Sequence, residues 1–128
     1  MKNIFFNLSV ALILASCAST VKTDISNKET ALTINDKVAF LDLNHKVPET
    51  AKRIGNAKFG DSGFSTDCNF NSNLIRARQI ARENGANIVK VTEAKNPNFW
   101  STCHRIEVDF YKYEGDVSAL QQYQLQVK

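Results

Sequence analysis

Apolar and polar positions alternate most regularly between residues 103 and 113. Every second side chain there is apolar or imidazole, and these side chains are His104, Ile106, Val108 and Phe110. The other face carries charged and tyrosine side chains. A period of two is that of a β-strand with one buried and one exposed face. The pattern therefore predicts a strand over 103–113, paired as a hairpin with a strand over 88–95.

The segment before this hairpin has apolar residues at the spacing of an α-helix. Its apolar residues fall at positions i, i+3, i+6 and i+7 of one face and are Leu74, Ala77, Ile80 and Ala81. Either Asn71 or Ser72 can cap the helix, because short polar side chains accept hydrogen bonds from the free N–H groups of the first turn. Gly85 can adopt the left-handed conformation in which helices commonly end. We expect a helix over 72–84, followed at once by the strand that starts at Ile88.

Two shorter apolar stretches precede the helix. Residues 38–43 are almost continuously apolar, which predicts a well-covered strand, and residues 54–59 alternate weakly, with Gly55 marking a bulge or close packing. Together with the hairpin they predict an α+β fold, in which about four strands form a mostly antiparallel sheet with one main helix on one face. We place this domain at 37–114 and expect a C-terminal tail over 115–128.

The chain begins with a short apolar segment that differs from all of these. Lys2 precedes an apolar run over 4–14, which is too short to span a bilayer comfortably. The run ends in Leu14-Ala15-Ser16-Cys17, which resembles the lipobox of bacterial lipoproteins. We therefore expect 1–16 to be a lipoprotein signal peptide. The alternatives are an ordinary cleaved signal and a short membrane anchor.

Cys17 is then the predicted site of lipidation. Its thiol would accept a diacylglycerol, and two or three acyl chains together anchor a protein stably in a membrane. Ala18 follows, where an Asp would favour retention in the inner membrane, so the resemblance favours the outer membrane of a Gram-negative bacterium. We expect the protein to face the periplasm. Residues 17–36 are largely polar and predict a flexible tether after the lipidated cysteine.

Composition and charge narrow the function further. The chain has 128 residues, 43% of them apolar, which is the size of one domain. Its 16 Lys and Arg residues oppose 13 Asp and Glu residues, for a net charge of +3. No stretch is basic enough to neutralise a phosphate backbone, so a nucleic-acid partner is not expected. The predicted partners are the membrane, through Cys17, and another envelope protein.

The other two cysteines are expected to form a disulfide. An envelope protein folds in an oxidising compartment, where Cys68 and Cys103 would pair. In the chain-entropy model, a disulfide that closes the loop from Cys68 to Cys103 stabilises the folded state by about 3–4 kcal/mol. Two free thiols, or a metal site that includes His45 or His104, are the alternatives.

The order of these features resembles a known family. Cys68 stands before the helix, the sequence Gly85-Ala86-Asn87 leads into a strand, and Cys103 lies at the next strand. This arrangement is similar to that of the RcsF-like and YbjQ-like small envelope domains, a stress-sensor lipoprotein superfamily, over about 53–113. The resemblance implies a disulfide between Cys68 and Cys103 and a stress-sensing role. RcsF itself carries two disulfides and a long proline-rich basic linker, and this chain has neither.

The sequence lacks the spaced motifs that are typical of hydrolases and of redox enzymes. It contains no Gly-x-Ser-x-Gly and no Cys-x-x-Cys motif, and Ser101 near His104 does not make a triad. The soft metal ligands lack zinc-site spacing, and an oxidised cysteine pair cannot bind a metal. We therefore expect no enzyme, no catalytic residue and no cofactor. His104 is the alternative metal ligand, although a histidine on an apolar face is more often packed in a core.

Four arginines and several aromatic residues are candidates for recognition. The arginines, which could approach one another and meet an acidic lipid or glycan, are Arg76, Arg78, Arg82 and Arg105. Solvated surface charges are the alternative. The predicted partner surface consists of Phe99 and Trp100 at the hairpin tip and Phe64 in the preceding long loop, which also contains Phe70. Large apolar residues in turns can anchor a partner. Alternatively they fold back over the disulfide and complete the core.

These observations predict a function. We expect a non-enzymatic envelope lipoprotein whose rigid domain binds another envelope component, in the manner of a stress sensor. The alternative is a periplasmic module that binds a small ligand or a metal.

Overall fold

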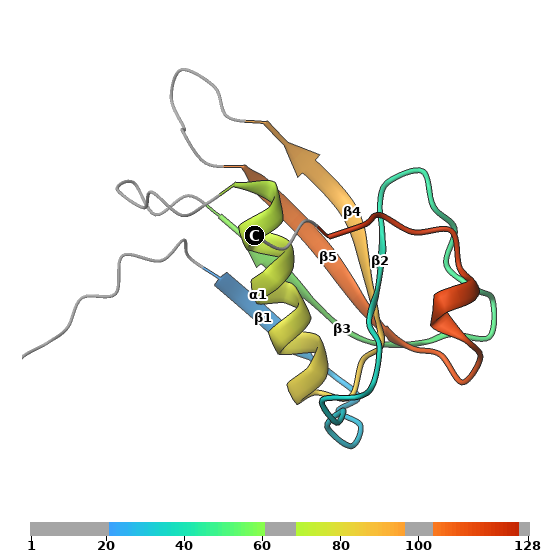
Figure 1. Cartoon of the computed structure of the whole chain (residues 1–128). Coiled ribbons are helices and arrows are strands. Elements are labelled where there is room, and N and C mark those ends of the chain that lie inside the picture. The colour runs from blue at the N-terminus through green and yellow to red at the C-terminus, as the bar shows by residue number, and fades with distance from the viewer. Residues whose placement is uncertain (1–20, 61–68, 97–103, 126–128) are drawn as a thin grey trace, which may run out of the picture.

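The computed structural model describes residues 21–60, 69–96 and 104–125. In chain order, the elements are β1 (Val21–Ile25), β2 (Ala39–Leu41), β3 (Lys52–Phe59), α1 (Phe70–Glu83), β4 (Ile88–Lys95), β5 (Arg105–Lys112) and a short 3-10 helix (Val117–Ala119). The five strands form one sheet in the order β1-β3-β5-β4-β2, and α1 lies across one face of it (Figure 1). The predicted α+β class with one main helix is confirmed.

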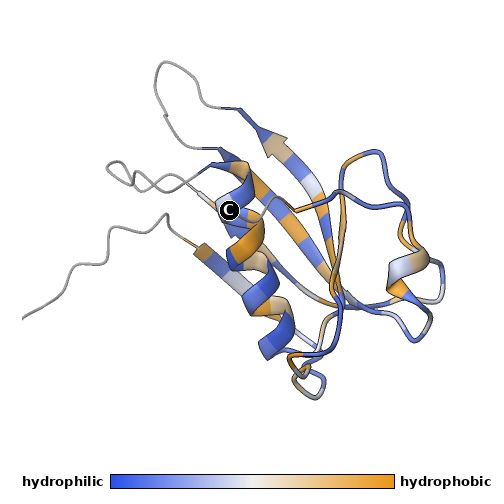
Figure 2. Cartoon of the chain, in the orientation of Figure 1, coloured by the Kyte–Doolittle hydropathy of each residue, from blue (hydrophilic) through white to orange (hydrophobic). Residues whose placement is uncertain are grey.

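The prediction of about four mostly antiparallel strands is wrong in two respects. The sheet has five strands, and it is mixed, because β2 runs parallel to β4 at one edge while the other three pairings are antiparallel. The predicted hairpin of β4 and β5 is confirmed, with Val91 opposite Val108. Burial alternates along β5, where Ile106, Val108 and Phe110 are buried. Figure 2 shows the same alternation of hydropathy.

The fifth strand comes from the segment expected to be a tether. β1 pairs antiparallel with β3, with Val21 opposite Phe59 and Ile25 opposite Gly55. A Cβ at Gly55 would lie 2.2 Å from the carbonyl oxygen of Asp24, so β1 approaches β3 this closely because residue 55 has no side chain. A register shift next to Gly55 confirms the predicted bulge. The folded part of the chain therefore includes residues that we assigned to the tether.

Residues that follow β1 are bonded to the C-terminal end of α1. The Glu29 N–H donates to the Asn84 carbonyl at 3.0 Å, and the Leu32 N–H donates to the Arg82 carbonyl at 2.9 Å. The last carbonyls of a helix lack partners within the helix, so these bonds satisfy them. Gly85 has a φ of +79°, as expected for the helix end. A Cβ there would meet Thr30 backbone, so the segment and the helix end fit closely.

At its other end, α1 is capped by Asn69, which lies two or three residues before the predicted caps Asn71 and Ser72. The Asn69 side chain accepts a hydrogen bond from the Ser72 N–H at 2.8 Å, and the helix begins at Phe70. The predicted inner face is confirmed for Leu74, Ala77 and Ala81, which are buried, and Ile80 is partly buried. Asn73 is also fully buried, and its amide nitrogen donates to the His104 carbonyl at 2.8 Å. This bond ties the start of α1 to the region just before β5.

The sheet buries apolar residues on both faces. The larger cluster lies under α1 and includes Phe59, Leu74 and Phe110. A smaller cluster on the other face joins Leu41 and Ile88 to Val117 of the 3-10 helix. The Tyr123 N–H also donates to the Phe40 carbonyl at 2.7 Å. Part of the segment expected to be a C-terminal tail is thus packed against β2.

Candidate functional site

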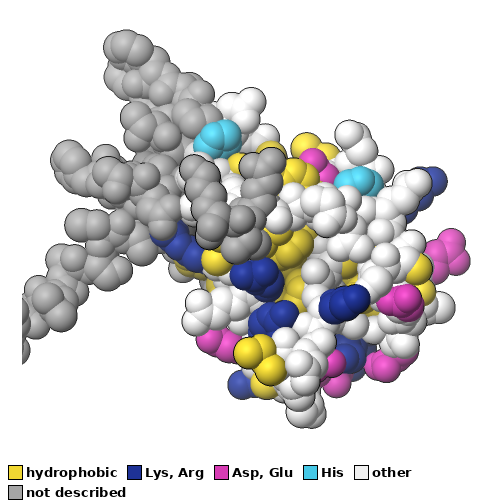
Figure 3. Space-filling model, viewed as in Figure 1, with side chains coloured by type: hydrophobic (Ala, Val, Ile, Leu, Met, Phe, Trp, Pro, Cys, Tyr) yellow, Lys and Arg dark blue, Asp and Glu magenta, His cyan; other side chains and the backbone are white. Residues whose placement is uncertain are grey.

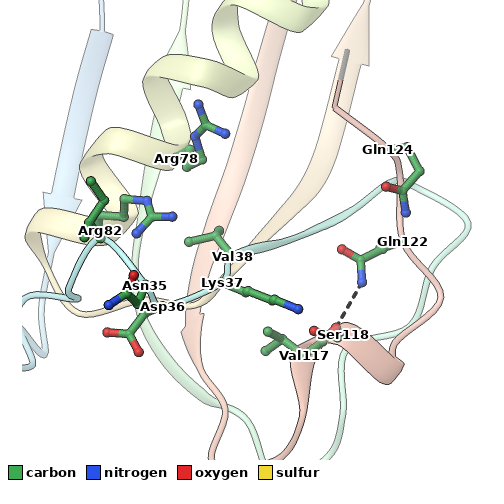
Figure 4. Close-up of a pocket in the computed structure, with 11 residues that line it drawn as sticks. Asn35, Asp36, Lys37, Val38, Arg78, Arg82, Val117, Ser118, Gln122 and Gln124 are labelled. Carbon is green, nitrogen blue, oxygen red and sulfur yellow. Dashed lines mark hydrogen bonds between the residues drawn. The ribbon is translucent and has the colours of Figure 1, made fainter. Parts of the chain in front are cut away.

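A polar groove of about 430 Å³ lies between α1, the segment that leads into β2, and the C-terminal segment (Figure 4). One wall is α1, which contributes Arg78 and Arg82. Lys37 and Val38 lie between the walls, and the opposite wall contains Val117, Ser118, Gln122 and Gln124. Hydrogen-bonding side chains predominate in this lining. We take this groove as the candidate binding site and call it the α1 groove.

Three cations line the α1 groove. Arg78 and Arg82 are four positions apart in a helix, which places them on the same face. The Arg82 Nη1 donates to the Thr33 carbonyl at 2.9 Å, so this guanidinium is held by a neutral group. Within the described part of the chain, neither the half-buried Arg78 nor the exposed Lys37 forms an ion pair or a hydrogen bond through its side chain. The groove therefore carries positive charge that its own residues do not neutralise.

Asp36 is the acid in this lining, among the residues that the structure describes. Its Oδ2 accepts hydrogen bonds from the Thr33 N–H at 2.7 Å and from the Thr33 hydroxyl at 3.0 Å. These two bonds hold the pKa of the Asp36 carboxyl below its usual value, with a further contribution from Lys112 and Arg82. The carboxylate is therefore ionised at neutral pH and stabilises its own turn.

The opposite wall presents hydrogen-bond acceptors. The Gln122 amide nitrogen donates to the Val117 carbonyl at 3.0 Å and to the Leu120 carbonyl at 3.2 Å. Because an amide has two N–H protons, these bonds use both of them. The Gln122 carbonyl oxygen is left as an acceptor, and Figure 4 shows it turned toward Lys37 and Val38. Cations thus line one wall of the groove, and the opposite wall offers an acceptor.

A second hollow of about 560 Å³ adjoins the α1 groove along the helix. Arg78, Arg82 and Ile34 line both hollows, and Leu32 and Ile75 line only the second. Ile34 is 92% exposed, which is unusual for so large an apolar side chain. Figure 3 shows Lys and Arg side chains gathered beside exposed hydrophobic surface on this face of the molecule. Apolar and cationic surfaces are therefore continuous here.

Most of the predicted site residues lie outside the described residues. These are Cys17, Phe64, Cys68, Phe99, Trp100 and Cys103. Phe70 is described, and its ring packs edge-on against Tyr123 with centroids 5.5 Å apart. It lies partly buried against the main core, so Phe70 contributes to packing.

The two histidines lie apart on the molecular surface (Figure 3). The His45 Nδ1 accepts a hydrogen bond from the Asp42 N–H at 2.9 Å, within its own turn. His104 is half-buried just before β5. Within the residues that the structure describes, no group of three or more His, Cys, Asp or Glu side chains could hold a metal ion.

The predicted arginine cluster is found in part. Arg78 and Arg82 share the α1 groove, whereas Arg105 lines a separate hollow beside Lys58 and Lys95. Lys37 and Gln122 were not predicted as site residues, since Lys37 is the first residue of the predicted domain and Gln122 lies in the segment assigned to the tail. The spacing of Arg78 and Arg82 was the only signal of the groove in the sequence.

Lys90 is a further polar residue with a structural role that was not predicted. Its ammonium group donates to the backbone carbonyls of Asp42, Leu43 and His45, at 2.5, 3.3 and 2.7 Å. Partial burial lowers the pKa of Lys90, and the charge of Asp42 opposes this effect. Lys90 thus fixes the turn that follows β2.

Comparisons with known proteins identify no relative. No family model, no curated protein and no solved structure matches the chain. Among the described residues, no helix is long and apolar enough to cross a membrane.

Proposed function

We propose that the protein is a lipoprotein of the Gram-negative envelope, held in the outer membrane by acylated Cys17 and facing the periplasm. In this proposal it acts by binding another envelope component and carries out no catalysis. The lipobox-like sequence that ends at Cys17 supports the anchor. Three residues separate Cys17 from Val21, where β1 begins, and this stretch can extend over at most about 14 Å. The domain would therefore sit close to the membrane.

The position of the α1 groove fits such an orientation. Val21 lies opposite Phe59, which lies opposite Ile106, so these residues mark one end of the sheet. Lys37 precedes Ala39, which pairs with Ile88 at the opposite end of the sheet. Lys37, which lines the groove, therefore lies near the end of the sheet that is away from Val21, where β1 begins. A component of the periplasm could reach it there.

The single observation that carries the recognition role is the net positive charge of the described residues that line the α1 groove. Three cations line it, and in the described part of the chain its one acid is hydrogen-bonded within its own turn. A half-buried guanidinium loses hydration, and an anionic partner would restore favourable interactions. This arrangement favours binding of an anionic component.

Photocrosslinking in cells tests this role. A photoreactive amino acid in place of Ser118, on the wall of the groove, should give an adduct that weakens when Arg78 is replaced by Gln. The same group at Glu49, which is exposed and outside the groove lining, is the matched control. Equal adducts from both positions, or none from Ser118, would contradict the proposal.

The alternative is a small-ligand module, which the size of the groove favours. Volumes of about 300–1,000 Å³ are usual for sites that bind small molecules. Native mass spectrometry of the protein purified from cells separates the two functions. A bound mass below about 1 kDa, lost in the Arg78→Gln variant, would favour the small ligand, and a protein adduct at Ser118 would favour the envelope protein.

The aromatic surface and the family resemblance are also part of this proposal. The order of Cys68, helix, turn, strand and Cys103 supports a stress-sensor role like that of the RcsF-like family. A photoreactive group at Trp100 should then capture the envelope partner, with Phe64 and Phe99 contributing to the same surface. Absence of a Trp100 adduct under every growth and stress condition would count against this surface.

A further inference from the structure

We infer that the α1 groove and the adjoining hollow bind a short peptide through its free C-terminal carboxylate and an apolar C-terminal side chain. This inference rests on the proposed binding function and adds the chemistry of the ligand. The carboxylate lies between Arg78 and Lys37, the apolar side chain lies against Ile34 and Ile75, and a peptide N–H donates to Gln122.

The carboxylate is assigned by the cations. Arg78 is half-buried on α1, and neither Arg78 nor Lys37 has an ion-pair partner in the described part of the chain. A guanidinium presents parallel N–H groups that match the two oxygens of a carboxylate. Arg82 is held in place by the Thr33 carbonyl, so it keeps its charge near the site while its position is fixed.

The apolar side chain is assigned by the adjoining hollow. Ile34 is 92% exposed and Ile75 is 38% exposed, and both line this hollow together with Arg78. Burial of apolar surface contributes about 25 cal/mol per Å², so an apolar side chain would bind there favourably. Inorganic phosphate has no apolar group that could pack against Ile34 and Ile75. A C-terminal residue offers its carboxylate and its side chain on the same carbon, as two adjoining subsites require.

The peptide N–H is assigned by the opposite wall. Gln122 uses both amide protons in bonds to the Val117 and Leu120 carbonyls, which leaves its own carbonyl oxygen to accept. An N–H group of a peptide supplies a neutral donor for this position. The ligand therefore carries a carboxylate that meets the cations and a hydrogen-bond donor that meets Gln122.

Calorimetric titration tests the inference. The probe is acetyl-Gly-Ala-Leu with a free carboxylate, titrated into the mature lipoprotein in detergent micelles. Arg78→Gln should weaken its binding at least tenfold, and the C-terminal amide of the same peptide should bind the wild-type protein at least tenfold more weakly. Lys22→Gln removes the same charge from exposed β1 and should leave the affinity unchanged. Lys37→Gln provides a second groove variant, should Arg78→Gln fail to fold.

Several results would overturn the inference. These are equal binding of the acid and the amide, equal binding of acetyl-Gly-Ala-Gly, competition by inorganic phosphate at the concentration of the peptide, and equal effects of Arg78→Gln and Lys22→Gln. If the acid peptide does not bind while the Ser118 adduct persists in cells, this inference fails and the proposed function stands. If the acid peptide does not bind and no Ser118 adduct forms in cells, both this inference and the proposed function are rejected.

Discussion

Lys90 shows how one cation can organise a turn in a small domain. It lies on β4 and donates to three carbonyls of residues 42–45, while burial lowers its pKa. Hydrogen bonds from a charged group contribute more to stability than neutral ones, because the charge of the donor strengthens its attraction to the acceptor. The turn after β2 therefore depends on a residue more than forty positions away.

Replacing Lys90 by Met should lower the free energy of unfolding by about 1–3 kcal/mol, because three backbone carbonyls lose their donor. Urea denaturation measures this change. Lys46→Met removes a charge from an exposed neighbour in the same turn region and should change stability by less than about 0.5 kcal/mol. Equal effects of the two substitutions would show that the carbonyl contacts do not stabilise the turn.

Asp36 makes a second prediction at the residue scale. The Thr33 hydrogen bonds keep its folded-state pKa below the usual 3.8, so its contribution to stability is present above pH 3.8 and is lost as the pH falls further. Carboxyl NMR should therefore give a midpoint below 3.8, which rises in Thr33→Val. Thr23→Val on β1 should leave the midpoint unchanged. A wild-type midpoint at or above 3.8 would contradict the hydrogen-bonded turn.

At the scale of elements, local patterns were enough for the helix and the hairpin. The repeat of Leu74, Ala77 and Ala81 and the alternation along 105–112 reflect burial against the nearest neighbours in the sheet. β1 was missed because an edge strand with four exposed residues out of five resembles a polar tether. The parallel pairing of β2 was missed because it depends on the path of residues 42–51 and not on β2 itself.

The same reason limits the prediction of the site. The four-residue spacing of Arg78 and Arg82 is visible in the sequence, and it places both residues on one face of α1. Lys37 and Gln122 reach the groove because β2 lies beside β4 and the C-terminal segment packs against β2. Such contacts between distant segments carry no local signal.

A substitution at Gly55 tests whether β1 packs closely against β3. Gly55→Ala should destabilise the protein by about 1–3 kcal/mol, because the new Cβ would overlap the Asp24 carbonyl and the Ile25 backbone. Hydrogen exchange should show faster exchange over Val21–Ile25 and little change in α1. Asn56→Ala, at the next position of β3, should leave β1 protected. Unchanged protection of β1 in Gly55→Ala would mean that β1 does not pack on β3 as described.

At the scale of the whole molecule, the proposal assigns the three cysteines to one anchor and one pair. A thiol titration of the denatured, unreduced protein should find no free thiol, because in this proposal Cys17 is acylated and Cys68 is bonded to Cys103. Reduction should release two thiols, and Cys103→Ser should expose one without reduction. The pair should stabilise the domain by about 3–4 kcal/mol. Two free thiols before reduction would contradict the disulfide.

The arrangement of the molecule links the anchor to the site. β1 begins at Val21, four positions after Cys17, and Lys37 of the α1 groove lies near the other end of the sheet. An acylated Cys17 would therefore hold the domain near the membrane with its cationic groove directed to the periplasm. The envelope location and the orientation of the groove in the proposed function depend on this anchor.

Metabolic labelling with radioactive palmitate tests the anchor most directly. We expect the wild-type chain to take up label and to fractionate with the outer membrane, whereas Cys17→Ser should take up none. Cys68→Ser serves as the control and should still be labelled. A wild-type chain without label, or a Cys17→Ser variant labelled as strongly as the wild type, would contradict the account.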